Sequence, residues 1–367
     1  MKIRMSLKKT YVIAEAGVNH NGSLKMAKEL VDAAVAAEAD AVKFQTFKTE
    51  SIVSRFAGKA DYQKETTGSQ SSQFEMIKEL ELDEPNQKKL FDYCREKGIQ
   101  FLSTPYDLES VDFLATELDL PTLKIASAEI TNGPLLLKAA QLQKSIILST
   151  GMCEPDEIET ALGVLAFGYI KPNAVPSLEG FKKVYLSSEG KSALLNRVTL
   201  LQCTTEYPAP YEEIHLRAME NLHGLFGLPV GYSDHTVGLA ISFAATALGA
   251  SIIEKHYTLD RNLPGPDHRA SLEPNELTDM IRGIREIEKA MGSPEKTCRP
   301  CEKKNKPVMR KSLIANEDIK KGDLLTDQNL IIKRPGDGVS PMQYWNYLGK
   351  SADKDYEPDE KISTIEK

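Results

Sequence analysis

The chain has 367 residues, of which 41% are hydrophobic and 27% charged, and its formal net charge is −7 at pH 7. This length leaves room for one barrel-sized domain and a smaller module, and the negative charge disfavours a nucleic acid or an anionic membrane as partner. No apolar stretch has membrane-spanning length, and the first ten residues lack the apolar core of a signal peptide, so a cytoplasmic protein with reduced cysteines is expected.

Eight short apolar runs, separated by segments of helical period, predict the strands of a parallel sheet. The runs are residues 11–14, 41–44, 99–102, 122–125, 145–148, 198–201, 229–231 and 251–253. Helical periodicity is clearest over 24–37, 87–97, 108–118 and 277–291. This alternation indicates repeated βαβ units, and eight of them predict a TIM (β/α)8 barrel over residues 1–291.

Local signals mark where several helices begin. The expected N-caps are Ser23, Asp107 and Asp156, and first-turn prolines are expected at Pro134, Pro155 and Pro274. Two connections, 48–84 and 171–196, are too long for simple links and are typical of lids, binding loops or insertions. The first follows the carboxyl end of a strand and is placed to cover a site there.

A smaller module is expected after the barrel. Residues 292–308 are rich in Pro, Lys and Cys and have no apolar period, so they are predicted to be a linker. Residues 309–367 carry short alternating segments with Gly322, Gly336 and Gly338 at turns, which predicts a small β-rich domain.

Polar residues follow each of the eight apolar runs. In chain order they are Glu15; Lys43 and Gln45; Ser103 and Thr104; Lys124, Ser127 and Glu129; Ser149 and Thr150; residues 203–207; residues 233–235; and residues 254–256. The carboxyl ends of all eight strands of a parallel barrel converge on one face. We therefore predict a single polar pocket at that face.

Two histidines, His235 and His256, follow the seventh and eighth runs, so neighbouring strands would present two imidazoles to the same pocket. We interpret them as ligands of a divalent metal. Two imidazoles completed by carboxylate or water suit an open site for Mn²⁺, with Mg²⁺ or Co²⁺ as alternatives, better than a closed zinc site. The alternative is that each is a hydrogen-bonded structural residue.

Two lysines, Lys43 and Lys124, stand in apolar runs where a charge is costly to bury. Together with the hydroxyl groups of Ser103, Thr104, Ser127 and Ser149 they would form a site for phosphate or carboxylate. One alternative is a pair of structural salt bridges to Glu15 and Glu129. Another is a Schiff-base nucleophile, although the neighbouring metal candidates weigh against it.

Further polar residues complete the predicted pocket. Glu129 is placed to orient a water molecule or a substrate hydroxyl, and Asp267, on a Pro- and Gly-rich loop, is placed to bind a polyol. A turn residue is an equally good interpretation of Asp267. Gln45 and Tyr207 are either sugar-binding or merely packed.

Nine motifs in order along the chain carry a resemblance to a known family. They read AEAGVNHNG, VKFQTF, STPYD, KIASAEI, LSTGM, LQCTTEYPAP, GYSDHTVG, EKHYTLDRNLPGPDHRASLEP and SLIANEDIKKGDLLTDQNLIIKRPGDGVSP. Together they resemble the sialic acid synthase family. The resemblance implies a TIM-barrel synthase domain followed by an antifreeze-like (SAF) domain, in a homodimer whose C-terminal domains each reach over the partner's barrel.

The resemblance also implies an activity, the condensation of phosphoenolpyruvate with an N-acetylmannosamine-type aldehyde with release of phosphate. It assigns the metal to His235 and His256; phosphoenolpyruvate to Lys43, Thr104, Lys124, Ser127, Ser149 and Ser233; and the amino sugar to Glu15, Gln45, Thr205, Tyr207, Asp267 and Arg310. Glu15 and the two histidines join Glu129 as the implied catalytic set, in which Glu129 positions water for attack at C2.

One position departs from the family pattern. Thr205 stands where many sialic acid synthases have Asn, and CTTEYPAP is similar to the version in synthases of legionaminic acid. The product is therefore either N-acetylneuraminate or N,N′-diacetyllegionaminate. The rival enzyme class is a Schiff-base pyruvate lyase or aldolase on the same fold, and the rival non-enzyme is a glycan-binding or ice-binding protein.

Overall fold

The computed structural model describes residues 9–67 and 70–364, and the chain divides into two compact units between Gly292 and Ser293. The first unit is built around eight parallel strands. They are β1 (Tyr11–Gly17), β2 (Ala41–Thr46), β3 (Gln100–Pro105), β4 (Thr122–Ile125), β5 (Ser145–Ser149), β6 (Val198–Gln202), β7 (Val230–Asp234) and β8 (Ile252–His256). Each overlaps one of the predicted runs, and all but β4 continue further into the polar residues that follow.

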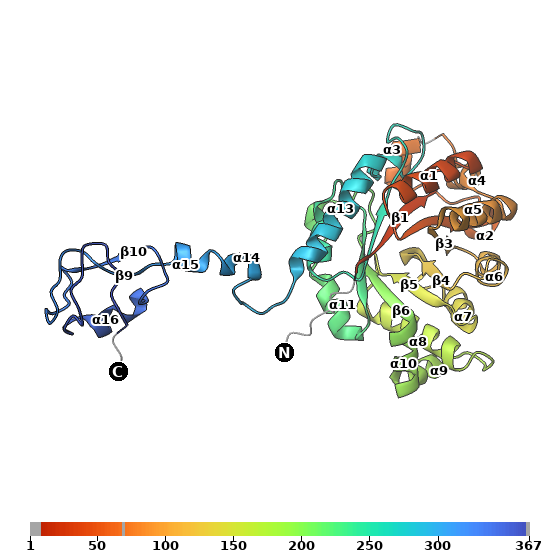
Figure 1. Ribbon diagram of the computed structural model, residues 1–367. Helices are drawn as coiled ribbons and strands as arrows, with labels where there is room; N and C mark the ends of the chain where they lie inside the picture. The colour runs from red at the N-terminus through yellow and green to blue at the C-terminus, as the bar shows by residue number, and fades with distance from the viewer. Residues whose placement is uncertain (1–8, 68–69, 365–367) are drawn as a thin grey trace. The chain divides into compact units, whose positions relative to one another are not determined.

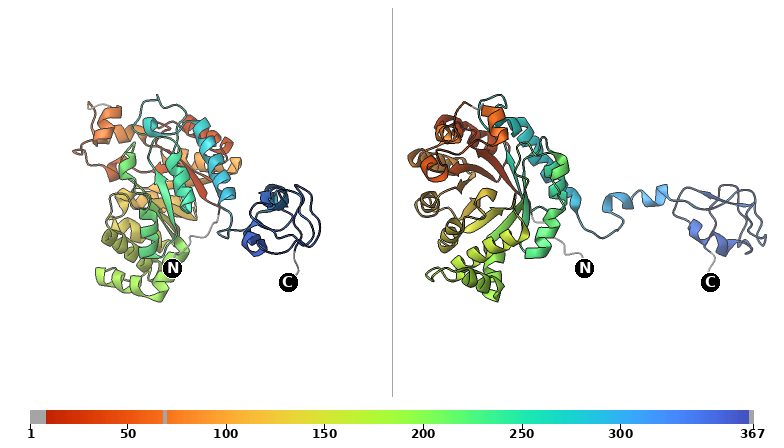
Figure 2. Two further views of the ribbon diagram at one scale, coloured as in Figure 1. Left: turned by 90° about the vertical axis from the view of Figure 1, so that its left-hand side faces the viewer. Right: turned by 180° about the vertical axis from the view of Figure 1, so that it is seen from behind.

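The strands form one sheet in the order β3-β2-β1-β8-β7-β6-β5-β4, and β3 and β4 lie in contact, so the sheet closes on itself. Helices surround it, as Figures 1 and 2 show. They are α1 (Leu24–Ala36), α5 (Glu84–Lys97), α6 (Leu108–Asp112), α7 (Gly133–Gln141), α8 (Pro155–Ile170), α11 (Ala218–Phe226), α12 (Ala240–Ala247) and α13 (Pro274–Met291). The predicted TIM-type barrel is confirmed.

Helix starts follow the local signals with one exception. The Ser23 and Asp107 side chains cap α1 and α6 by accepting hydrogen bonds from Met26 N and Ser110 N, and the three prolines stand in first turns as predicted. The prediction of Asp156 as an N-cap is wrong, because Pro155 occupies the first turn of α8 and Glu154 becomes the cap.

The predicted helix over 108–118 is in fact two elements. After α6 the chain continues as a π-helical turn, η1 (Phe113–Glu117). This wider turn buries three consecutive residues, Phe113, Leu114 and Ala115, which a regular helix would distribute around its surface.

Both long connections are folded. Residues 48–84 contain α2 (Thr49–Ile52), α3 (Asp61–Thr67) and α4 (Gln73–Leu80). Residues 171–196 contain α9 (Leu178–Leu186) and all but the last residue of α10 (Ser188–Arg197). Helices α9 and α10 pack against α8 on the outside of the barrel (Figure 1).

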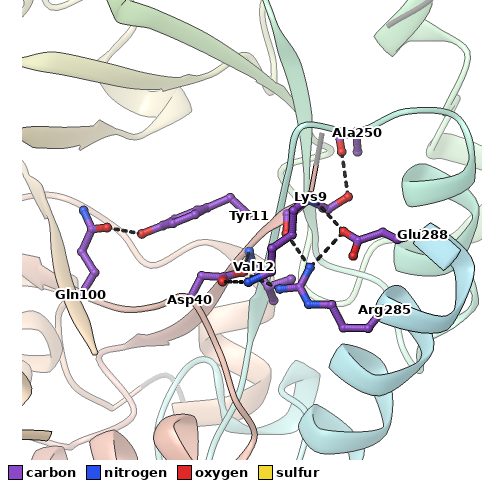
Figure 3. A network of polar contacts seen from close by, with 9 residues as sticks. Lys9, Tyr11, Val12, Asp40, Gln100, Ala250, Arg285 and Glu288 are labelled. Atoms are coloured by element: carbon purple, nitrogen blue, oxygen red, sulfur yellow. Dashed lines mark hydrogen bonds and ion pairs between the residues drawn. The ribbon is translucent and has the colours of Figure 1, made fainter. Parts of the chain in front are cut away.

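The amino-terminal ends of the strands are held by a polar network (Figure 3). Asp40, just before β2, accepts hydrogen bonds from Val12 N at 2.9 Å and from Arg285 of α13 at 2.6 Å. Arg285 also donates to Glu288 and to the carbonyl of Thr10. The network joins the first strand to the last helix of the barrel, so it stabilises the face opposite the strand ends that carry the predicted site.

The second unit has its own core, which includes Leu313, Ile319, Leu325, Leu330 and Tyr356. Its elements are α14 (Pro300–Lys303), α15 (Lys306–Met309), β9 (Ser312–Ala315), β10 (Leu330–Lys333), η5 (Pro341–Gln343) and α16 (Tyr344–Tyr347). Strands β9 and β10 are antiparallel, and isolated bridges take the place of further strands. The two short helices α14 and α15 lie in or next to the predicted linker and were not expected.

No helix within residues 9–67 and 70–364 is long and apolar enough to cross a membrane. All five cysteines are free thiols.

Candidate active site

A cavity of about 260 Å³ lies at the carboxyl ends of the strands. Its lining includes Glu15, Lys43, Gln45, Thr104, Lys124, Ser127, Ser149, Thr205, Tyr207, Ser233, His235, His256 and Asp267. These predicted site residues come from all eight strands or from the loops directly after them. The structure therefore brings them together at one face, as a parallel barrel requires.

Strand register explains why the side chains meet. Glu15 of β1 is paired with Lys43 of β2 on one side and with His256 of β8 on the other. Ser233 of β7 is paired with Glu254 of β8 in the same way. Successive residues of a strand point to opposite faces, so Glu254 and His256, two residues apart, both point into the barrel.

The centre of the cavity is a buried network of two ammonium groups and two carboxylates. Lys43 Nζ lies 2.7 Å from Glu15 Oε2 and 3.6 Å from Glu254 Oε2, and Lys124 Nζ lies 3.5 Å from Glu254 Oε1. Of the predicted salt bridges, Lys43 with Glu15 forms, but Lys124 pairs with Glu254 and not with Glu129. The sequence placed Glu254 among the polar residues at the strand ends but assigned it no role; its spacing of two from His256 indicates that both side chains face the pocket.

The two carboxyl groups of this network differ in their protonation at neutral pH. Although burial opposes it, Lys124 and Lys43 together hold the pKa of Glu254 well below its usual value. Burial raises the pKa of Glu15 to about 7, in spite of the Lys43 ammonium beside it. Two ammonium groups thus face one carboxylate that stays ionised and one that holds a proton for part of the time at neutral pH. Burial lowers the pKa of Lys124, whereas the carboxylates of Glu15 and Glu254 outweigh burial and raise the pKa of Lys43. With both lysines protonated the network has a positive balance, which suits an anionic ligand.

Hydroxyl groups surround the ammonium groups. Lys43 donates to Thr104 Oγ1 at 3.1 Å, and Ser233 donates to Glu254 at 2.8 Å. Ser127 Oγ accepts from Gly151 N at 2.8 Å. The buried Ser149 Oγ has no hydrogen-bond partner in the described ranges. A buried hydroxyl without a partner is costly, so this group is available to a ligand.

The prediction that Ser103 belongs to this anion site is wrong. Its Oγ lies 2.6 Å from Thr46 Oγ1, which donates to Gln87 of α5. Ser103 and Thr104 are neighbours on β3, so when Thr104 points into the barrel Ser103 must point outward to the helices.

The two histidine rings lie side by side, with centroids 5.6 Å apart. His235 Nδ1 is 2.6 Å from the carbonyl of Thr204, which can only accept, so Nδ1 carries the proton and Nε2 is left with a lone pair. His256 Nδ1 is buried and has no partner within the described part of the chain. Burial lowers the pKa of His235 to about 4 and that of His256 well below its usual value. Both imidazoles are therefore neutral at pH 7, which is the form that binds metals.

The donor set fits an open metal site. Among residues 9–67 and 70–364, no cluster of three or more His, Cys, Asp and Glu side chains has the geometry to hold a metal ion. An ion at His235 and His256 would have to complete its coordination with water or substrate. The orphaned His256 nitrogen and the carbonyl that fixes the His235 ring are the features expected around such ligands.

A second group of side chains lies next to the histidines. A Cβ atom added at Gly17, whose φ is +53°, would lie 3.4 Å from both Glu15 Oε1 and His256 Cε1 and 3.5 Å from Gln45 Nε2. These three side chains therefore converge on Gly17, where the absence of a side chain leaves space for them. The Tyr207 ring packs on His235 with centroids 4.2 Å apart. Burial raises the pKa of Asp267 to about 6.

Thr205 lies in a crowded part of the lining. A Cβ at Gly151 would come within 2.3 Å of Thr205 Oγ1, so only glycine allows this approach. Thr205 Oγ1 is buried and finds no hydrogen-bond partner among the described residues. After Ser149, it is a second unpartnered hydroxyl in the cavity lining.

Besides Ser103, two predicted site residues are not in this lining. Glu129 ends the turn η2 (Ser127–Glu129), is half-buried, and accepts a hydrogen bond from Asn132 at 2.7 Å. Arg310 belongs to the second unit, two residues before the start of β9, where its backbone closely approaches Gly336. Their roles in positioning water and binding the sugar stay predictions.

Comparison with known proteins adds a family to this geometry. The NeuB family model matches residues 30–296, and the SAF domain model matches residues 310–364. The chain belongs to the NeuB family. This confirms the resemblance drawn from the motifs, and it favours a synthase over the Schiff-base lyase and over the glycan-binding or ice-binding protein.

The relatives of this NeuB family member include two curated N,N′-diacetyllegionaminic acid synthases. The protein of that name from Campylobacter jejuni is 51% identical, over 97% of this chain and 99% of its own length. The one from Legionella pneumophila is 42% identical, over 95% and 92%. A crystal structure of N-acetylneuraminic acid synthetase from Leptospira borgpetersenii, in complex with citrate, is 32% identical with a TM-score of 0.65 and covers 82% of this chain and 91% of its own.

Proposed function

We propose that this NeuB protein is an N,N′-diacetyllegionaminic acid synthase. It would condense phosphoenolpyruvate with 2,4-diacetamido-2,4,6-trideoxymannose and release phosphate. One observation carries the proposal: a single cavity combines two buried ammonium groups with two neutral, adjacent imidazoles. The names of the relatives that are 51% and 42% identical support this acceptor over N-acetylmannosamine.

The ammonium groups of Lys43 and Lys124 are proposed to bind the phosphate and carboxylate of phosphoenolpyruvate. Ion pairs and hydrogen bonds to charged oxygens are strong in a water-poor cavity. Hydroxyl groups of Thr104, Ser127, Ser149 and Ser233 would complete the binding set. The free hydroxyl of Ser149 supports this role, since a substrate oxygen would give it the partner that it lacks.

His235 and His256 are proposed to hold a divalent ion, most simply Mn²⁺, with Mg²⁺ or Co²⁺ able to replace it. When bound, such an ion would polarise the acceptor's carbonyl oxygen and lower the activation barrier for attack on the carbonyl carbon by several kcal/mol. The side chains of Glu15, Gln45, Tyr207, Thr205 and Asp267 would bind and orient the open-chain sugar.

The reaction then needs one proton and one water molecule. C3 of phosphoenolpyruvate forms a bond to the aldehyde carbon, and the aldehyde oxygen takes up a proton. Glu15, whose pKa is raised to about 7, is placed to supply it. Water adds to the electron-poor C2, with Glu129 as the proposed positioning group, and loses one proton, which balances the proton that the aldehyde oxygen took up. The C2–O bond to phosphate then breaks while the C2 hydroxyl becomes the ketone carbonyl, and the second proton leaves with the phosphate.

Phosphate release distinguishes the two acceptors. With Mn²⁺ and phosphoenolpyruvate, we expect faster release with 2,4-diacetamido-2,4,6-trideoxymannose than with N-acetylmannosamine. Faster release with N-acetylmannosamine would make the protein an N-acetylneuraminate synthase. No release with either, from folded and metal-loaded protein, would contradict the proposed function.

The acceptor's apparent affinity is expected to depend on pH through Asp267. Its raised pKa of about 6 leaves the carboxyl mostly neutral at pH 5 and mostly ionised at pH 7. An ionised carboxylate accepts sugar hydroxyl hydrogen bonds more strongly, so the KM for the sugar should fall as pH rises through 6. Asp267→Asn should abolish this part of the pH dependence. A variant with the same KM profile as the wild type would contradict the assignment.

We also propose a homodimer in the cytoplasm, with no nucleic acid or membrane partner. The resemblance to sialic acid synthases supports an exchanged SAF domain, in which Arg310 of the partner subunit contacts the acetamido group of the sugar. The separate core of the second unit is compatible with such an exchange, because its buried side chains form a cluster distinct from that of the barrel.

A further inference from the structure

One wall of the cavity is apolar, in contrast to the charged floor. It consists of a cluster of six side chains, all of which line the cavity: Val18, Phe47, Ile52, Ile77, Leu80 and Tyr106. This apolar wall is separate from the main barrel core, which packs between strands and helices. Its position on the lining puts hydrocarbon within reach of a bound substrate.

The wall combines two parts of the chain. Val18, Phe47 and Tyr106 directly follow β1, β2 and β3, whereas Ile52, Ile77 and Leu80 come from α2 and α4 in the long connection after β2. The long connection therefore adds aliphatic side chains to the site. Gln63 of α3 also lines the cavity, so the same segment contributes one amide.

Polar contacts fix these helices in place. Glu81, directly after α4, accepts hydrogen bonds from the backbone N and the hydroxyl of Thr49, at 3.0 and 2.7 Å. Lys78 of α4 forms ion pairs with both Glu50 and Glu81 at 3.1 Å. Helix α2 is thereby tied to α4, and the wall is preformed.

The sheet order places the wall beside other strands than those that carry the histidines. His235 and His256 stand at the ends of β7 and β8, whereas the wall follows β1, β2 and β3 and includes side chains of α2 and α4. Gln45 of β2 lines the same cavity. An acceptor bound through C1 at the proposed metal site and directed toward Gln45 would present its distal carbons to the wall.

We propose that the apolar wall binds the C6 methyl group of a 6-deoxy amino sugar and so selects it over a 6-hydroxy sugar. This inference rests on the proposed function and adds the structural basis of its acceptor choice. A methyl group gains free energy on leaving water for such a wall, whereas a hydroxyl group loses its hydrogen bonds to water without replacement. A hydrophobic pocket rejects an added hydroxyl by about 100-fold at most, so a measurable but incomplete preference is expected.

Two sugars that differ in one oxygen atom test the wall: N-acetylmannosamine and its 6-deoxy analogue. The wild type should use the 6-deoxy sugar with a kcat/KM about 10- to 100-fold higher. If the enzyme does not turn over one of these sugars, both are compared as competitive inhibitors of the reaction with 2,4-diacetamido-2,4,6-trideoxymannose, and their inhibition constants are used in place of kcat/KM. Equal values for the two sugars would overturn the proposal.

Matched variants locate the preference in the wall. Ile77→Thr and Ile77→Val both shorten the side chain by its terminal carbon. The Thr side chain also carries a hydroxyl group where Val has a methyl group. The Thr variant should narrow the preference for the 6-deoxy sugar by about threefold or more, and the Val variant should keep it. Ile52→Thr and Ile52→Val repeat the comparison from α2. If Thr and Val variants show the same preference at both positions, the wall does not contact C6.

The two levels of the proposal fail differently. If the wild type releases no phosphate from phosphoenolpyruvate with the diacetamido sugar, the proposed function is contradicted. Normal release from that sugar, without a preference between the two monoacetamido sugars, would contradict only the role of the apolar wall.

Discussion

His256→Ala is expected to lower kcat at least about 100-fold while the barrel remains folded, because loss of this proposed metal ligand would remove several kcal/mol of barrier lowering. The side chain is neutral, and its Nδ1 has no partner among the described residues, so its removal breaks no ion pair and no hydrogen bond of that atom. Turnover would be measured by phosphate release in saturating Mn²⁺, and folding by circular dichroism and thermal unfolding.

His223→Ala is the matched control. His223 lies on α11, outside the cavity lining, and its ring bonds to the carbonyl of Leu228. It should keep wild-type turnover and Mn²⁺ affinity, whereas His256→Ala should lose both. Near-normal turnover of His256→Ala in Mn²⁺-saturated buffer would show that His256 is not a ligand of the catalytic metal.

The barrel and most of the site were predictable because both follow from chain periodicity. Short apolar runs that alternate with helical segments have few arrangements other than a parallel barrel, and such a barrel gathers every strand end at one face. The residues at those ends, such as Lys43, Lys124, His235 and His256, were therefore found without knowledge of any contact.

The failures have a common physical origin, which is side-chain direction. Ser103 and Glu254 both stand at strand ends, and only the register of the sheet decides that the first points outward and the second inward. Glu129 lies in the turn η2 after β4, and Glu254 stands beside Lys124 in its place. A one-residue change in register would exchange the two faces, and the sequence does not specify where each run starts to that accuracy.

The apolar wall was unpredictable for a different reason. Its side chains from 48–84 lie in short helices whose position depends on contacts such as that of Glu81 with Thr49, more than thirty residues apart. Propensity and periodicity describe a helix but not the direction in which a connection folds back over a barrel. The sequence indicated only that a long connection stood on the correct side.

A buried ion pair behind the histidines should contribute strongly to stability. Lys255 Nζ lies 3.0 Å from Asp234 Oδ2, and both side chains are fully buried on the outward face of β8 and β7. The same carboxylate accepts from Ser242 of α12 at 2.6 Å. Lys255→Met would leave the Asp234 charge buried without its cation, which should reduce the free energy of unfolding by about 3–5 kcal/mol.

Urea unfolding of four proteins tests this: wild type, Lys255→Met, Asp234→Asn and the double variant. The double variant should recover much of the loss, because neither charge is then left unpaired. Lys138→Met, which breaks the half-exposed pair with Asp112, should cost at most about 1 kcal/mol. Additive losses in the double variant would contradict a direct interaction.

The pair also connects stability to the proposed chemistry. Asp234 and Lys255 are in register across β7 and β8, and each directly precedes a histidine of the candidate metal site. The pair therefore links the outward faces of the two strand ends that carry His235 and His256. We expect the double variant, although folded, to bind Mn²⁺ about 10- to 100-fold more weakly, as when groups that orient metal ligands are removed elsewhere. Calorimetric titration with Mn²⁺ measures this directly; wild-type affinity in a folded double variant would show that the pair stabilises the barrel without positioning the histidines.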